Sequence, residues 1–263
     1  MSNSFSCFSS CFRRYSMSRI AVAVLLSVVN CCAIAMGGVV TVPDGITSTG
    51  GTNTALNDGD RTYQMQFGAS YLGGISVGDK ITGISFRIAS NSQEPDSPAS
   101  SFTNWDLTLA QAANSVSTMS TTFANNMSDP ELVRSGALSF AAGAFQGGAV
   151  NPNTNPFGPV IAFSTPYTYR GGDLVVLISH TAGTSTVGFL DSLNSSSPAY
   201  GSGYRALRTS AYGATTATTS DATLTITQFT IESGSPVVPE PSMMVIASVL
   251  GIGGYVGKRR MKK

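Results

Sequence analysis

Cysteine is confined to the start of this 263-residue chain. Its four cysteines, Cys7, Cys11, Cys31 and Cys32, all lie within the first 32 residues. The rest of the chain contains none, which excludes disulfides, a cysteine-ligated metal site and a cysteine nucleophile there. A domain built from the later residues therefore has to be held together by its apolar core alone.

Histidine is equally scarce, since His180 is the only one in the chain. A metal site made from several histidines is therefore excluded by count. His180 ends an apolar run, residues 174–180, and we expect its ring to hydrogen-bond to the backbone at a strand end. A base in a Ser–His–Asp relay is the alternative.

Acidic residues form no complete metal-binding or catalytic motif. Asn57-Asp58-Gly59-Asp60 has the start of a calcium-binding loop but not its further spaced acids or closing Glu. Asp-Gly is typical turn chemistry, so we expect a turn at this position. Two carboxylates that meet in space, as in a glycoside hydrolase, remain an alternative. We assign no catalytic residue, no metal and no cofactor.

Basic residues are few in the body of the chain. Of the 15 Lys and Arg, three precede residue 20 and five follow residue 257, whereas all 14 acids lie between Asp44 and Glu240. The body is therefore negative by about seven charges, although the formal net charge of the chain is +1. Because nucleic-acid binding needs a basic face, we expect no nucleic-acid partner.

The first 35 residues have the pattern of a secretory signal peptide. An apolar run, residues 20–29, follows Arg13, Arg14 and Arg19, and Ala33-Ile34-Ala35 offers a cleavage site at Ala33 and Ala35. Met17 would give a signal of more ordinary length, so the true start is Met1 or Met17. A lipoprotein signal at Cys31 is the alternative.

The chain ends in three successive signals. Residues 233–242 form a linker that contains a Pro-Glu-Pro motif, residues 243–257 are apolar without a charge, and residues 258–263 are basic. Fifteen residues span roughly 22 Å as a helix, against roughly 30 Å of hydrocarbon core. We expect a single transmembrane helix over 243–257, which would fit because the flanking Lys and Arg side chains snorkel and the bilayer thins locally. The basic residues after it favour a cytoplasmic tail. A buried C-terminal helix is the alternative.

This arrangement resembles the PEP-CTERM sorting signal, in which a Pro-Glu-Pro motif precedes a short apolar helix and a basic end. The resemblance covers about the last 26 residues and leaves the body unassigned. It implies that an exosortase, an intramembrane transpeptidase, recognises Pro239, Glu240 and Pro241 and processes the tail during export. It also implies an association with exopolysaccharide. The apolar tail of such a tag is removed in other C-terminal sorting systems.

Residues 36–232 show short strand-like runs separated by Gly, Pro, Asn and Asp. We predict an all-β domain, an antiparallel β-sandwich of jelly-roll type, with residues 174–180 at the centre of a sheet. Residues 222–231 alternate, which predicts a strand with one buried face. Asp129-Pro130-Glu131 is typical of a helix start, so we expect a short helix near residues 129–133. A β-solenoid is the alternative, although no fixed repeat is present.

Aromatic residues supply the remaining candidates for binding. Trp105 is in phase with Leu107 and Leu109, so we expect it in the core. Tyr200 and Tyr204 lie in a segment rich in Gly and Ser, and we expect them to be exposed and able to stack on sugar rings.

Together these patterns predict a non-enzymatic exported protein of the cell surface or extracellular matrix, sorted by an exosortase and held by the membrane at least before its tail is processed. A carbohydrate-binding module for exopolysaccharide is the alternative, and a secreted glycoside hydrolase is the third hypothesis.

Overall fold

The computed structural model describes residues 37–45, 50–90, 94–150 and 152–234. The predicted signal peptide with Ala33 and Ala35 lies outside the described residues. So do the Pro239-Glu240-Pro241 motif, the predicted transmembrane helix and the basic tail.

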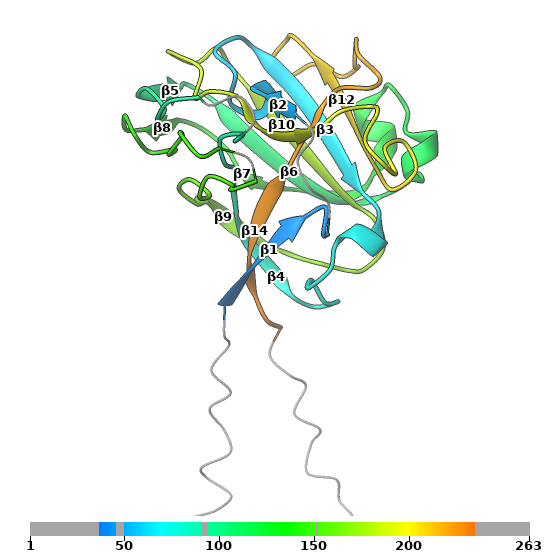
Figure 1. Ribbon diagram of the computed structural model, residues 1–263. Helices are drawn as coiled ribbons and strands as arrows, with labels where there is room; N and C mark the ends of the chain where they lie inside the picture. The colour runs from blue at the N-terminus through cyan, green and yellow to red at the C-terminus, as the bar shows by residue number, and fades with distance from the viewer. Residues whose placement is uncertain (1–36, 46–49, 91–93, 151, 235–263) are drawn as a thin grey trace, which may run out of the picture. The chain divides into compact units, whose positions relative to one another are not determined.

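The described chain is all-β, with antiparallel sheets and four short 3-10 turns (Figure 1). No α-helix occurs among the described residues. The strands are β1 Gly37–Val42, β2 Gly50–Thr52, β3 Arg61–Phe67, β4 Lys80–Ser85, β5 Ser100–Phe102, β6 Trp105–Ala112, β7 Met127–Arg134, β8 Leu138–Phe140, β9 Ile161–Thr168, β10 Leu174–His180, β11 Leu190–Leu193, β12 Tyr204–Thr209, β13 Leu224–Thr225 and β14 Thr227–Glu232.

The larger sheet has five strands in the order β12-β3-β10-β6-β7. The central strand is β10, as the apolar run of residues 174–180 predicts. Both neighbouring strands pair along its full length. Five of its seven residues are buried, because Leu174, Val176 and Ile178 face the main core and a smaller apolar cluster partly covers the other face. A strand whose two faces are both covered needs apolar side chains on both, which this run supplies.

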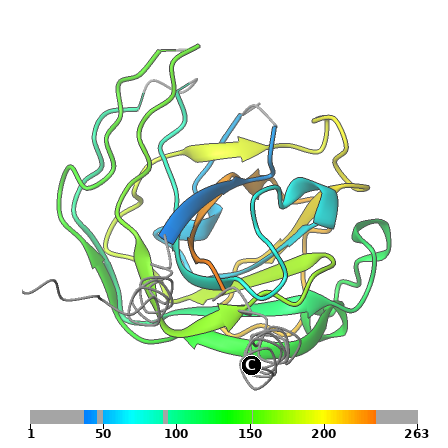
Figure 2. The same cartoon turned by 90° about the horizontal axis from the view of Figure 1, so that it is seen from below.

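The second sheet has four strands in the order β1-β14-β4-β9. Its strand β9 contains Pro166 and lies at the sheet edge, where the missing N–H breaks no ladder. The register of β4 against β14 shifts where Gly83 pairs with Thr230 and Ile81 with Ile231, so Thr82 is the extra residue of a bulge beside Gly83. Strands β1 and β14 pair from Gly37↔Glu232 to Val42↔Thr227, and Figure 2 shows them side by side from below.

Two smaller sheets complete the fold, in the orders β13-β11-β2 and β5-β8. The prediction of one half-buried strand over residues 222–231 is wrong. This stretch divides into β13, which pairs with β11, and β14, which lies between β1 and β4. Thr225 and Thr227 are therefore buried instead of exposed. The Thr227 hydroxyl donates to the carbonyl of Thr225 at 3.1 Å, so one buried polar group is satisfied locally.

A continuous apolar core joins side chains from both large sheets. Tyr63, Met65 and Phe67 of β3 belong to it, as do Ile84 of β4 and Phe229 of β14. Burial of each such side chain contributes about 1.5–3 kcal/mol to folding.

Trp105 is fully buried in this core, which confirms its predicted position. Its Nε1 donates to the carbonyl of Ala55 at 3.1 Å. The guanidinium of Arg134 lies over its ring, 5.6 Å from the centroid.

A second, smaller cluster of Met119, Phe123 and Leu207 packs on the other face of the five-stranded sheet. Under the same loops, Gln64 of β3 is fully buried, where it donates to the carbonyl of Phe123 and accepts from Asn126. Both faces of β3 are therefore covered.

The predicted helix near residues 129–133 is wrong, because this stretch is part of edge strand β7. Asp129 and Pro130 together oppose Ala110, since Ser128 pairs with Gln111 and Glu131 with Leu109. Asp129 has a φ of 47°, typical of a bulge residue. Asp-Pro-Glu here marks a bulge in an edge strand, where proline is tolerated.

Candidate functional site

The two tyrosines predicted to bind sugar lie close together, but the expectation that both are exposed is wrong. Tyr204 is 0% exposed and its hydroxyl donates to the carbonyl of Pro198. Its ring makes edge contacts with Tyr200 at 6.0 Å and with Tyr71 at 5.5 Å between centroids. Tyr200 is half-buried. With Tyr204 inside the core, the pair cannot form a flat platform for a pyranose ring.

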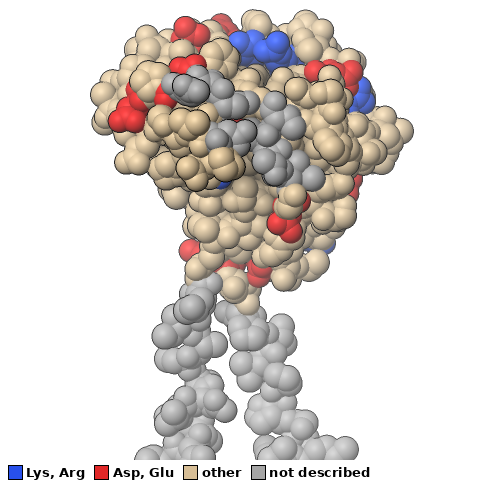
Figure 3. All heavy atoms as spheres, viewed as in Figure 1, with Lys and Arg blue, Asp and Glu red and all other residues tan. Residues whose placement is uncertain are grey.

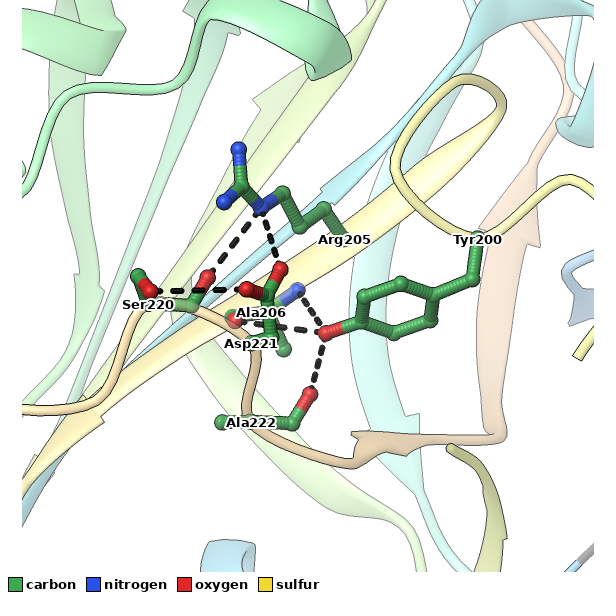
Figure 4. Close-up of polar contacts among 6 residues, drawn as sticks. All are labelled: Tyr200, Arg205, Ala206, Ser220, Asp221 and Ala222. Carbon is green, nitrogen blue, oxygen red and sulfur yellow. Dashed lines mark hydrogen bonds and ion pairs between the residues drawn. The ribbon is translucent and has the colours of Figure 1, made fainter. Parts of the chain in front are cut away.

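The hydroxyl of Tyr200 bonds to the backbone along the open edge of β12 (Figure 4). It accepts from the amide of Ala206 at 3.2 Å and donates to the carbonyl of Ala222. The amide of Ala222 donates to the carbonyl of Ala206 at 2.9 Å. Together, Tyr200 and Ala222 occupy edge positions that a further strand would fill. Burial raises the pKa of Tyr200 to about 12, so its hydroxyl stays protonated at neutral pH.

An ion pair lies beside this edge. Arg205 Nε is 3.0 Å from Asp221 Oδ1 and donates to the carbonyl of Ser220 at 3.1 Å (Figure 4). The Asp221 side chain is 51% exposed. This pair fixes residues 220–222 against β12, and an exposed pair of this kind adds little stability.

His180 lies at the end of β10, as predicted, and is buried. Its Nδ1 lies 2.9 Å from the carbonyl of Thr181, and its Nε2 lies 3.4 Å from the carbonyl of Thr54. Phe102 makes an edge contact with the ring at 5.0 Å. Burial lowers the pKa of His180, which favours the neutral ring. These contacts confirm the predicted backbone hydrogen bond.

Residues 74–78 form a G-x-S-x-G sequence, which is not among the motifs singled out above. In hydrolases this sequence forms a sharp turn between a strand and a helix. Here it leads into β4, and Ser76 forms a turn in which its amide donates to Asp79 Oδ2 at 2.8 Å. No hydrogen bond within the described ranges joins Ser76 to His180, whose ring nitrogens lie near the carbonyls of Thr181 and Thr54.

The Asn57–Asp60 segment is a turn, as expected. Asn57 Oδ1 accepts from the amide of Gly59 at 2.8 Å, and Asp60 Oδ1 accepts from the amide of Ala182 at 2.6 Å. Within the described part of the chain, no group of three or more His, Cys, Asp or Glu is placed to hold a metal ion.

The ion pair of Arg87 and Asp191 is a polar feature that the sequence did not predict. The Asp191 side chain is 1% exposed, and the Arg87 guanidinium also lies 4.9 Å from the centroid of the Phe157 ring. No local motif signals this pair, because its members are 104 positions apart and meet only through the fold.

No helix in the described ranges has the length and apolar character needed to cross a membrane. No protein-family profile, curated protein or solved structure matches this chain.

Proposed function

We propose that this protein is an exported, non-enzymatic β-sandwich domain that reaches the cell surface or extracellular matrix after an exosortase processes its tail at Pro239-Glu240-Pro241. The observation that carries this proposal is the pairing of Gly37 with Glu232, the first and last strand residues of the domain. The sequence has its secretory signal immediately before this pair and its sorting signal immediately after it. The two signals therefore flank a folded unit and interrupt none of its strands.

The polar chemistry of the domain supports a structural role for its most conspicuous residues. The ring of His180 and the hydroxyls of Tyr200 and Tyr204 all contact backbone groups. The two large sheets contribute to one core, which supports a sandwich. Sugar stacking on Tyr200 and Tyr204 loses its main support because Tyr204 is buried.

The sorting step is tested by replacing Pro239, Glu240 and Pro241 with alanine while the apolar run and basic end stay intact. A matched control replaces Pro236, Val237 and Val238 in the same way. We expect the first variant to keep its tail and remain in the membrane fraction. The control should be processed like the wild-type protein. An identical mature mass and location for the wild-type protein and the first variant would contradict the proposal.

A further inference from the structure

The domain has few cations, and the partners of most of them are clear. Of the seven Lys and Arg in residues 37–234, Arg87, Arg170 and Arg205 form ion pairs. Arg134 donates to three backbone carbonyls, and Lys80 faces Glu232 across β4 and β14. Figure 3 shows how sparse charged side chains are on one face.

The two remaining cations, Arg61 and Arg208, are neighbours. Arg208 pairs with Tyr63 across β12 and β3, and Arg61 lies two residues before Tyr63. Arg61 and Arg208 are therefore diagonal neighbours on the same face of this strand pair, within reach of each other's long side chains. Within the described part of the chain, no carboxylate lies within 4.0 Å of either guanidinium.

Arg61 is held in position by neutral groups. Its Nη1 donates to the Ser210 hydroxyl at 2.6 Å and its Nη2 donates to Asn57 Oδ1 at 2.9 Å. The residue is only 9% exposed, and its Nε has no hydrogen-bond partner among the described residues. Burial and the nearby charge of Arg208 both lower the pKa of Arg61.

Arg208 presents the more accessible charge. The residue is half-buried, and its guanidinium makes no hydrogen bond or ion pair with any described residue. A guanidinium that makes no hydrogen bond to the protein, beside a second one, can donate to an anion in place of water, and the anion would offset the repulsion between the two cations.

We propose that Arg61 and Arg208 form a binding site for an oxyanion group. Arg208 supplies the planar fork that contacts the anion, Arg61 adds a second positive charge behind it, and Ser210 and Asn57 hold Arg61 in place. The same chemistry is offered by a free inorganic anion such as sulfate and by the carboxylate of an acidic polysaccharide. The site belongs to the folded domain and does not depend on how the tail is processed.

Asp58 is the natural competitor of such an anion. Its charge favours the protonated form of Arg61, yet it lies beyond ion-pair distance in the described structure. Neutralising Asp58 should therefore tighten anion binding, whereas neutralising Arg208 should weaken it.

The test measures thermal unfolding of the full-length protein in detergent with added sodium sulfate, galacturonate or oligogalacturonate. Galactose and sodium chloride of equal ionic strength are the controls. At ten times the Kd the anion should raise the Tm by about 3 °C. Arg208→Gln should weaken binding about tenfold or more, and Asp58→Asn should strengthen it. Arg205→Gln removes the same charge from the same strand and should leave binding unchanged.

Arg208→Gln has a second signature, because it also removes the repulsion between Arg61 and Arg208. Without anion its Tm should equal or exceed that of the wild-type protein, so lost binding cannot be ascribed to unfolding. A stronger response to oligogalacturonate than to sulfate identifies a polysaccharide as the source of the anion, and an equal response identifies a small ion. The proposal is overturned by the absence of any shift beyond the chloride control, or by equal shifts in the wild-type protein and Arg208→Gln.

Discussion

Arg87 and Asp191 form an ion pair inside the domain, with 2.5 Å between Arg87 Nε and Asp191 Oδ2. Asp191 Oδ1 has no hydrogen-bond partner within the described ranges, so the carboxylate depends on this one cation. The backbones of the two residues also meet, because the amide of Asp191 donates to the carbonyl of Arg87 at 2.9 Å. The pair therefore ties β11 to the chain that follows β4.

Removal of the Asp191 charge should be strongly destabilising. Asp191→Asn keeps the shape of the side chain and leaves Arg87, which is 16% exposed, without its counter-ion. We expect the free energy of unfolding to fall by about 3 kcal/mol. Urea denaturation followed by the fluorescence of Trp105 measures this change. The control is Asp221→Asn, which breaks an exposed pair and should cost less than about 1 kcal/mol. Equal losses of unfolding free energy in the two variants would show that the buried pair stabilises the domain no more than the exposed one.

Loss of the Tyr200 hydroxyl should weaken the edge of β12. Tyr200→Phe removes the hydrogen bonds to Ala206 and Ala222 while the ring contact with Tyr204 remains. We expect a loss of about 1–2 kcal/mol, because the buried amide of Ala206 loses a partner. Tyr71→Phe is the matched control, since the Tyr71 hydroxyl makes no hydrogen bond with a described residue. It should change stability by at most about 0.5 kcal/mol. Indistinguishable urea curves for the two variants would contradict this role.

His180 should make the domain less stable at mildly acidic pH. Its folded-state pKa lies below the unfolded value of 6.5, because burial disfavours the charged ring. Above pH 6.5 both states are neutral and the stability is fully present. As the pH falls below 6.5, the unfolded state takes up the proton first, so the free energy of unfolding falls by up to about 1.4 kcal/mol per pH unit.

Urea denaturation at intervals from pH 7.5 to 5.0 gives this slope. His180→Gln keeps a donor and an acceptor near the carbonyl of Thr181 and removes the titrating ring. Its stability should vary less over the same range. A variant with the wild-type slope would assign the pH dependence to other groups.

Periodicity predicted the centre of the fold well. The run at residues 174–180 is apolar on both faces, which suits a strand in the middle of a sheet that is covered on both faces, and β10 has that position. Trp105 was placed correctly for a related reason, since its phase with Leu107 and Leu109 sets the buried face of β6.

The predictions that proved wrong concern side chains whose burial depends on segments far away in the sequence. Thr225 and Thr227 look like a solvent face in sequence, but the chain passes from one sheet to another between them. Gln64 is buried because a loop some 60 residues away covers it. Tyr204 is drawn inward by strand pairing with Phe67 and by the rings of Tyr71 and Tyr200. The local pattern contains none of these contacts.

The intact mass of the mature protein, isolated from the cells that produce it, tests the central claim most directly. If the tail is a sorting tag, the mass should correspond to a chain that begins after Ala35 and ends near Glu240. A mass that still includes Lys263 would mean that the tail is a permanent part of the protein, which would contradict processing by an exosortase.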